Sequence, residues 1–189
     1  MCKKYLRLNP KIMLQILFCL LLANISACSW LQPKTNNLLA ITSDTQTRVA
    51  QQQWRLTYEQ QQYLLQVIVE RSADHWQWVL MNSLGQRLAT VTSIAGVVRI
   101  EQQQSHPANK LLPDLLQAWQ FSYWPLIDLQ QHADKAWQFS GSHTHREVLF
   151  SGILRAAIDY STQNPWQGSV QYYDKKRHFQ LFIESQLLN

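Results

Sequence analysis

Apolar and polar residues alternate along the first half of the chain, in short runs separated by turn-forming residues. Such a period of two residues is typical of strands that bury one face. The positions predicted to share one side are Trp76, Trp78 and Leu80 in one run, and Leu88, Thr90 and Thr92 in the next. The pattern predicts an antiparallel meander of about five strands, at residues 54–58, 63–70, 76–81, 87–93 and 97–101.

The period of the apolar residues changes to three or four after the fifth predicted strand. Leu111, Leu115, Ala118 and Trp119 follow helical spacing, and a proline and an aspartate suit the first turn of this helix. A second short helix is predicted at residues 125–132. Strand patterns then return at residues 136–140, 146–150, 154–160, 169–174 and 178–184.

These elements predict a mainly β (α+β) fold, in which a short helical insertion interrupts a many-stranded antiparallel sheet. A sheet of this size twists and curls, so its concave face can cover the helices. We therefore expect a curved antiparallel half-barrel with the helical insertion over its concave face. Apolar helices in that position can belong to a filled core or form a removable plug over a cavity, and periodicity does not distinguish the two.

The N-terminal region has the pattern of a secretory signal peptide. Four basic residues and no acids accompany an apolar stretch at residues 12–22, which is about half the length that a transmembrane helix needs. Residues 25–28, Ile-Ser-Ala-Cys, resemble the bacterial lipobox, which implies cleavage before Cys28 and lipidation of its thiol. An ordinary signal peptide followed by a chance cysteine is the alternative. The expected organisation is a cleaved peptide at 1–27, a lipidated tether at 28–45 and a single domain at 46–189.

Cleavage changes the electrostatic picture. The full chain has a formal net charge of +5, but four of its 17 basic residues and none of its 12 acids lie before Cys28. The mature chain of about 162 residues would carry 13 bases against 12 acids, so its charge gives no reason to expect nucleic acid as a partner. Two of the three cysteines leave with the signal peptide, and no disulfide is expected. A mature chain of this length suits one domain, and we expect a monomer.

Sequence motifs for catalysis are lacking. There is no Gly-x-Ser-x-Gly, no His-Glu-x-x-His and no phosphate-binding loop, so we expect neither enzyme activity nor a cofactor. His143 and His145 would lie on one face of a strand, which supplies half of a metal site. A solvated strand face is the more common arrangement for such a pair, and no metal is expected.

Eight tryptophans are the most distinctive feature of the composition. Indole rings build cores, line cavities or lie at membrane interfaces. Trp30, close to Cys28, is the candidate for a membrane interface. The residues predicted to line a cavity are Trp78, Leu80, Leu115, Trp119 and Trp124.

Two motifs resemble those of DUF3261, a family of uncharacterised proteobacterial lipoproteins. They are Leu-Gly-Gln-Arg at residues 84–87 and Tyr-Trp-Pro at residues 123–125, and the resemblance covers about residues 54–183 together with the lipobox. More distantly, residues 75–101 resemble the strands and the Asn-x-Leu-Gly turn of LolB, the outer-membrane receptor for lipoproteins. This resemblance implies a half-barrel with an apolar cavity for acyl chains and a role for Leu84 in membrane insertion. Leu84 could instead fold back onto its own sheet, and Ser83 in place of the proline of LolB implies a less rigid loop.

The resemblance implies an outer-membrane lipoprotein, anchored through Cys28 on the periplasmic face, that receives or places a lipid-bearing cargo. Ser29 agrees with this location, because an aspartate there favours retention in the inner membrane in the sorting rule of such lipoproteins. Expected partners are membrane lipids, a lipidated protein or aryl-polyene-type lipid as cargo, and a periplasmic LolA-like carrier. The alternative function is an interaction or structural module of the envelope. A continuous apolar void under the helices would favour the carrier, and a packed interior would favour the module.

Overall fold

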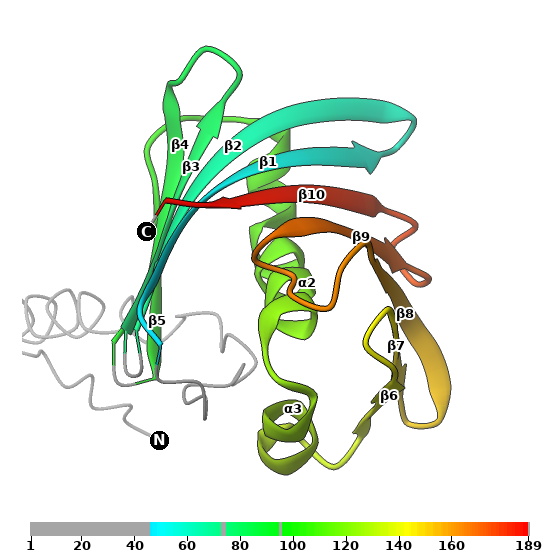
Figure 1. The fold of residues 1–189 in the computed structure, drawn as a ribbon. Coiled ribbons are helices and arrows are strands. Elements are labelled where there is room, and N and C mark those ends of the chain that lie inside the picture. The colour runs from blue at the N-terminus through cyan, green and yellow to red at the C-terminus, as the bar shows by residue number, and fades with distance from the viewer. Residues whose placement is uncertain (1–45, 73–74, 95, 189) are drawn as a thin grey trace, which may run out of the picture. The chain divides into compact units, whose positions relative to one another are not determined.

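A computed structural model of the chain describes residues 46–72, 75–94 and 96–188. The strands in this part are β1 Arg48–Tyr58, β2 Gln61–Arg71, β3 His75–Asn82, β4 Arg87–Ile94, β5 Val97–Gln102, β6 Trp137–Gly141, β7 His145–Phe150, β8 Ile153–Tyr160, β9 Gly168–Asp174 and β10 Gln180–Leu187. They form one 10-stranded sheet in the order β5-β4-β3-β2-β1-β10-β9-β8-β7-β6, and all its pairs are antiparallel (Figure 1). The predicted meander is confirmed, although β1 begins well before residue 54.

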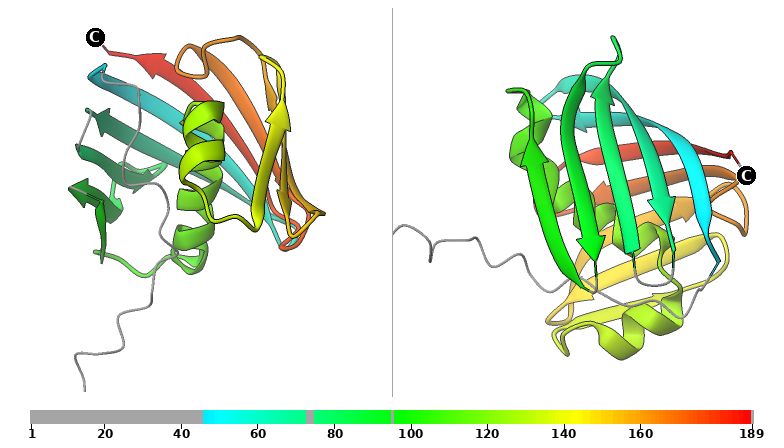
Figure 2. Two further views of the ribbon diagram at one scale, coloured as in Figure 1. Left: turned by 90° about the horizontal axis from the view of Figure 1, so that it is seen from below. Right: turned by 90° about the vertical axis from the view of Figure 1, so that its left-hand side faces the viewer.

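The first and last strands meet at the centre of the sheet. β1 pairs with β2 on one side and with β10 on the other, where Trp54 lies opposite Ile183. β5 and β6 are the two edges, and they do not pair with each other. The sheet therefore curves strongly without closing into a barrel, as the predicted half-barrel requires (Figures 1 and 2).

The helical insertion connects β5 to β6. It consists of a 3₁₀ helix, η2 Pro107–Leu111, followed by α2 Leu112–Tyr123 and α3 Leu126–His132. Pro113 lies in the first turn of α2, where backbone N–H groups have no partner within the helix, so proline loses no hydrogen bond there. Asp114 in the same turn adds a negative charge, which the positive end of the helix dipole favours. Trp124 is extended before Pro125 and ends α2. Both predicted helices are thus confirmed, and α2 lies within the curve of the sheet (Figure 2).

The inner face of the N-terminal strands follows the predicted phase. Trp76, Trp78 and Leu80 in β3 are 3%, 0% and 1% exposed. Trp54 and Leu56 in β1 are buried to the same degree. The centre of the sheet therefore presents a tryptophan-rich surface to the helices.

In β4, the prediction of which residues share the buried face is correct for Leu88 and wrong for Thr90 and Thr92. The register between β3 and β4 shifts next to Leu80, and Leu88 has no residue directly opposite. This β-bulge buries both Leu88 and Ala89, so that Thr90 and Thr92 point away from the face predicted for them. A single inserted residue reverses the alternation, which the sequence pattern does not reveal.

A buried aspartate holds the turn between β9 and β10. Asp174 is 2% exposed, and its Oδ1 accepts hydrogen bonds from the backbone N–H groups of Lys176 at 2.9 Å and Arg177 at 2.6 Å. Its Oδ2 lies 3.4 Å from Nη2 of Arg155 in β8. Arg177 in turn pairs with Asp114 in the first turn of α2, with 3.0 Å between Nε and Oδ1. Asp174 thus connects β8, this turn and, through Arg177, the start of the helix.

Substitution of this aspartate should strongly destabilise the fold. Asp174→Ala is expected to lower the free energy of unfolding by about 3–5 kcal/mol, because it leaves the Arg155 side chain, which is only 13% exposed, without its carboxylate. The control is Asp159→Ala, which removes a carboxylate that is 64% exposed and lies 2.7 Å from Nδ1 of His145. This control should cost no more than about 1 kcal/mol. Urea unfolding measures both variants, and equal losses would show that Asp174 does not hold the turn.

Candidate functional site

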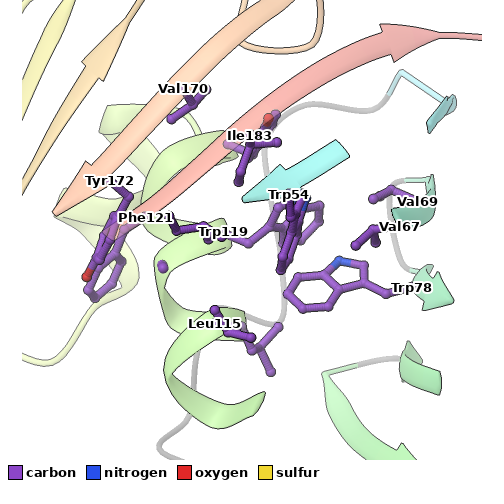
Figure 3. Close-up of a cluster of buried hydrophobic side chains, with 14 of the residues drawn as sticks. Trp54, Val67, Val69, Trp78, Leu115, Trp119, Phe121, Val170, Tyr172 and Ile183 are labelled. Atoms are coloured by element: carbon purple, nitrogen blue, oxygen red, sulfur yellow. The ribbon is translucent and has the colours of Figure 1, made fainter. Parts of the chain in front are cut away.

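Six tryptophans form a continuous group, the tryptophan cluster, between α2 and the sheet. Its members are Trp54 of β1, Trp76 and Trp78 of β3, Trp119 of α2, Trp124 just after α2, and Trp166 between β8 and β9. Trp119 is central, because its ring centroid lies 4.9 Å from those of both Trp78 and Trp124. Figure 3 shows Trp119 and Leu115 of α2 directed toward Trp54 and Trp78 of the sheet. The helix is therefore joined to the concave face through aromatic contacts.

The five residues predicted to line a cavity all lie in this interior. Their exposed fractions are 0% for Trp78, 1% for Leu80, 0% for Leu115, 0% for Trp119 and 1% for Trp124. They belong to one buried core, so side chains of the described residues fill the space beneath the helix. Their role in binding a cargo stays a prediction.

Several buried polar atoms of the tryptophan cluster and of α2 have no hydrogen-bond partner among the described residues. They are Nε1 of Trp76, Trp78, Trp119 and Trp124, and both side-chain amide atoms of Gln120. Trp54 differs, since its Nε1 donates to Oε1 of Gln52 at 3.0 Å. A buried polar group without a partner costs about 1–3 kcal/mol, and folded proteins contain few of them. The tryptophan cluster and α2 thus hold hydrogen-bonding groups that a bound molecule could use.

A cleft of about 530 Å³ opens at the C-terminal end of α2. Its walls come from segments far apart in the sequence, namely Arg48 at the start of β1 and parts of residues 122–126, 141–146 and 160–166. Trp124 and Trp166 belong both to this lining and to the tryptophan cluster. The cleft therefore extends the cluster to the surface, and of the predicted cavity residues it includes Trp124 alone.

Arg146 and Tyr160 bind the end of α2 where it borders the cleft. Nη1 of Arg146 donates hydrogen bonds to the carbonyl oxygens of Phe121 and, at 3.1 Å, of Trp124. The Tyr160 hydroxyl donates to the carbonyl oxygen of Ser122 at 3.0 Å. Burial raises the pKa of Tyr160 to about 12, so the phenol stays protonated at neutral pH. Burial lowers the pKa of Arg146, but a guanidinium keeps its charge in proteins. These bonds satisfy carbonyl groups that a helix end leaves free.

Leu84 lies at the tip of the turn between β3 and β4, and it is 80% exposed. Oδ1 of Asn82 accepts hydrogen bonds from the backbone N–H groups of Leu84 and Gln86, each at 3.0 Å. Gly85 has a φ of +75°, which glycine adopts without strain. The turn closes on itself in this way, and the alternative in which Leu84 folds back onto the sheet does not occur. Membrane insertion of Leu84 stays a prediction.

The remaining predicted residues lie elsewhere. Cys28 and Trp30 are outside the described residues, as are the signal peptide and the tether. His143 precedes β7, which begins at His145, so the two imidazoles do not share a strand. In the described part of the chain, no group of three or more His, Cys, Asp or Glu residues is arranged to hold a metal ion. The helices described there are too short or too polar to cross a bilayer.

Sequence analysis did not identify Arg48, Arg146, Trp166 or Gln120 as site residues. Arg146 of β7 and Trp124 at the end of α2 are 22 positions apart, and only the tertiary fold brings them together. Gln120 lies on a helix whose neighbouring residues are mostly buried, and the sequence gives no sign that its amide lacks a partner. These residues carry no recognisable motif.

Comparison with curated proteins finds no match to this chain. The family described as "Protein of unknown function (DUF3261)" matches residues 49–187, which run from β1 to β10 and include the whole helical insertion. The matched region contains both motifs on which the resemblance rests, at residues 84–87 and 123–125. The chain therefore belongs to the DUF3261 family.

Proposed function

We propose that this protein is a lipid-anchored component of the outer membrane that binds a lipid or lipidated cargo between α2 and the concave face of the sheet. It then helps to place this cargo in the membrane. The observation that carries the proposal is the set of unpartnered polar atoms in the tryptophan cluster and on Gln120. In a core that only has to be stable, such atoms are a net cost. In a binding interior, they can meet the ester or amide groups that attach acyl chains to a lipid or a lipoprotein.

The attachment of α2 supports its role as a removable plug. Among the described residues, polar contacts tie α2 to the sheet at its two ends, through Asp114 and Arg177 at its start and through Arg146 and Tyr160 at its last turn. Between these ends, aromatic and aliphatic contacts join the helix to the sheet. Apolar attraction is non-directional, so an acyl chain can replace these contacts when the helix moves outward.

Leu84 supports a membrane contact in addition to the lipid on Cys28. Burying a leucine side chain in an apolar phase yields about 1.5–3 kcal/mol, which is too little for stable anchoring alone but adds to an acyl anchor. Leu84 and the start of β1 lie at opposite ends of the strands, and the 11 residues of β1 cover about 36 Å. The 17 residues between Cys28 and Gln46 have a maximum extended length of about 60 Å. The anchor and the loop can therefore reach the same bilayer.

The proposal places the protein on the periplasmic face as a monomer. A periplasmic LolA-like carrier fits as the donor, and the cargo is a lipidated protein or an aryl-polyene-type lipid. No chemical step and no cofactor are assigned to the protein, because binding and release are sufficient for this role.

The packing of the interior favours a second candidate function. All five predicted cavity residues are at most 1% exposed and lie in a single core. A filled core suits an interaction or structural module of the envelope. The two functions differ in whether the unpartnered polar atoms of the tryptophan cluster and Gln120 form hydrogen bonds to a ligand.

Gln120→Leu separates these two functions. The substitution removes two unpartnered polar atoms, so the free energy of unfolding should rise by about 1–3 kcal/mol. In a carrier, the tighter helix should also reduce the amount of lipid bound. Full-length protein is expressed in membranes, extracted gently, and measured by urea unfolding and by mass spectrometry of bound lipid. Gln117→Leu, at a half-buried position of the same helix, is the matched control and should leave the bound lipid unchanged.

Lipid recovery decides the outcome of this experiment. If Gln120→Leu is stabilised and binds as much lipid as the wild type, the interior is not the binding site. If the wild type itself yields no lipid, the filled-core module is the better function.

Leu84→Glu tests the membrane contact. A charged side chain at the tip does not enter a bilayer, so transfer of bound lipid to phospholipid vesicles should slow by about 10- to 150-fold. The control is Val97→Glu, at a position 61% exposed at the start of β5, next to the other end of β4. Its transfer rate should match the wild type. Equal slowing in both variants would mean that the added negative charge causes the effect, and the specific role of Leu84 would be wrong.

A further inference from the structure

The cleft at the end of α2 contains an arginine, Arg146, that lacks a carboxylate partner among the described residues. The lining residues in the described part of the chain also include Arg48, and none of them is Asp or Glu. Two other arginines near the helix form ion pairs, since Arg155 and Arg177 have carboxylate oxygens at 3.4 Å and 3.0 Å. Arg146 therefore differs from these two arginines.

The positive charge of Arg146 is only partly compensated. The carbonyl groups of Phe121 and Trp124 that accept from its Nη1 belong to the helix C-terminus, which offers only about half of a negative charge. A guanidinium has five N–H donors, and the three on Nε and Nη2 lie beyond these contacts. No carboxylate of the described residues is within ion-pair distance of Arg146. An anion would stabilise a partly buried cation of this kind. A carboxylate or a phosphate presents two oxygens on one atom, and these match two N–H donors of the planar guanidinium.

Aromatic rings link this charge to the interior. The guanidinium carbons of Arg48 and Arg146 each lie 5.6 Å from a ring centroid, that of Trp166 and that of Tyr160 respectively. Trp166 also contacts Trp119 at the centre of the tryptophan cluster, with 6.1 Å between ring centroids. A molecule with its charged group in the cleft would place its apolar part against rings that continue beneath α2.

We infer that the cleft binds a phosphate or carboxylate group, with Arg146 as the principal contact and Arg48 as the second. The group is the anionic head of an amphiphile whose acyl part enters the interior, and in this respect the inference rests on the proposed function. A free oxyanion has the same chemistry, and the experiment below distinguishes the two sources. An Arg146 that only caps α2 is the competing explanation.

The test uses full-length protein in phosphatidylcholine nanodiscs and follows tryptophan fluorescence, because Trp124 and Trp166 line the cleft. The probes are dihexanoyl phosphatidic acid, dihexanoyl phosphatidylcholine and inorganic phosphate. Phosphatidic acid should bind at least about tenfold more tightly than phosphatidylcholine, as expected for one charge-assisted contact. Arg146→Gln should remove this preference and Arg146→Lys should keep part of it. Arg99→Gln, which removes an exposed arginine of β5 outside the cleft, should leave the preference unchanged.

A second variant keeps the test decisive, because Arg146 also holds the end of α2. Arg48→Gln lowers the charge of the cleft from the side of β1 and should weaken phosphatidic acid binding by severalfold, and circular dichroism checks that each variant is folded. Tighter binding of phosphatidic acid than of inorganic phosphate supports a lipid head. Equal binding of these two probes supports the site and assigns it to a free oxyanion.

Two further outcomes distinguish this inference from the proposed function. If both lipids bind equally and neither Arg146→Gln nor Arg48→Gln changes their affinity, the anion site is wrong, while lipid recovered with the wild type would still support the carrier. If phosphate binds through Arg146 and no lipid is recovered, the anion site is supported and the carrier function is wrong.

Discussion

The concave face of the sheet must be covered, and the rest of the structure depends on how α2 covers it. β5 and β6 do not pair, so in the described part of the chain the sheet neither closes nor receives a second sheet on its inner side. A helix of 12 residues, about 18 Å long, lies at the centre of this face. Protein interiors are packed to the density of organic crystals, so the space between a helix and a curved sheet needs large side chains. Trp119 fills it from the helix, and Trp76 and Trp78 fill it from the sheet.

The same choice of residues creates the unpartnered polar atoms. Each indole that fills space also buries an N–H donor, and the carbonyl groups of the neighbouring strands are already used in the sheet. Trp54 avoids this cost, because its Nε1 donates to Gln52, which in turn donates to Ser185, and the Ser185 hydroxyl also bonds the hydroxyl of Tyr123. Trp76 and Trp78 of β3 have no such partner for their Nε1 among the described residues. An interior of this kind is well packed but incompletely satisfied, which suits a helix that exchanges its contacts with those of a ligand.

The sequence predicted the elements of this fold better than it predicted the site. Period-two spacing placed Trp76, Trp78 and Leu80 on the buried face, and helical spacing placed α2, because both patterns are set by neighbours along the chain. The β4 phase failed at one bulged residue, whose insertion no local pattern records. Of the candidate site, sequence reasoning found Trp78, Trp119 and Trp124 by residue type and Leu84 by motif. It missed the cleft, because Arg48, Arg146 and Trp166 meet only through pairing of strands that are distant in sequence.

Strand register places Leu84 and the cleft at opposite ends of α2. The β3–β4 turn lies at the same end of the sheet as the β9–β10 turn, whose Arg177 contacts the first turn of α2, whereas Arg146 contacts the last turn. The helix length of about 18 Å is close to one leaflet of the hydrocarbon core, about 15 Å. A molecule with its anionic head beside Arg146 would therefore extend its acyl chain along the tryptophan cluster toward the end that carries Leu84. In this orientation the acyl chain, and not the head, would face the bilayer that the proposed function assigns to Leu84, so transfer would begin with the part of the cargo that the bilayer solvates best.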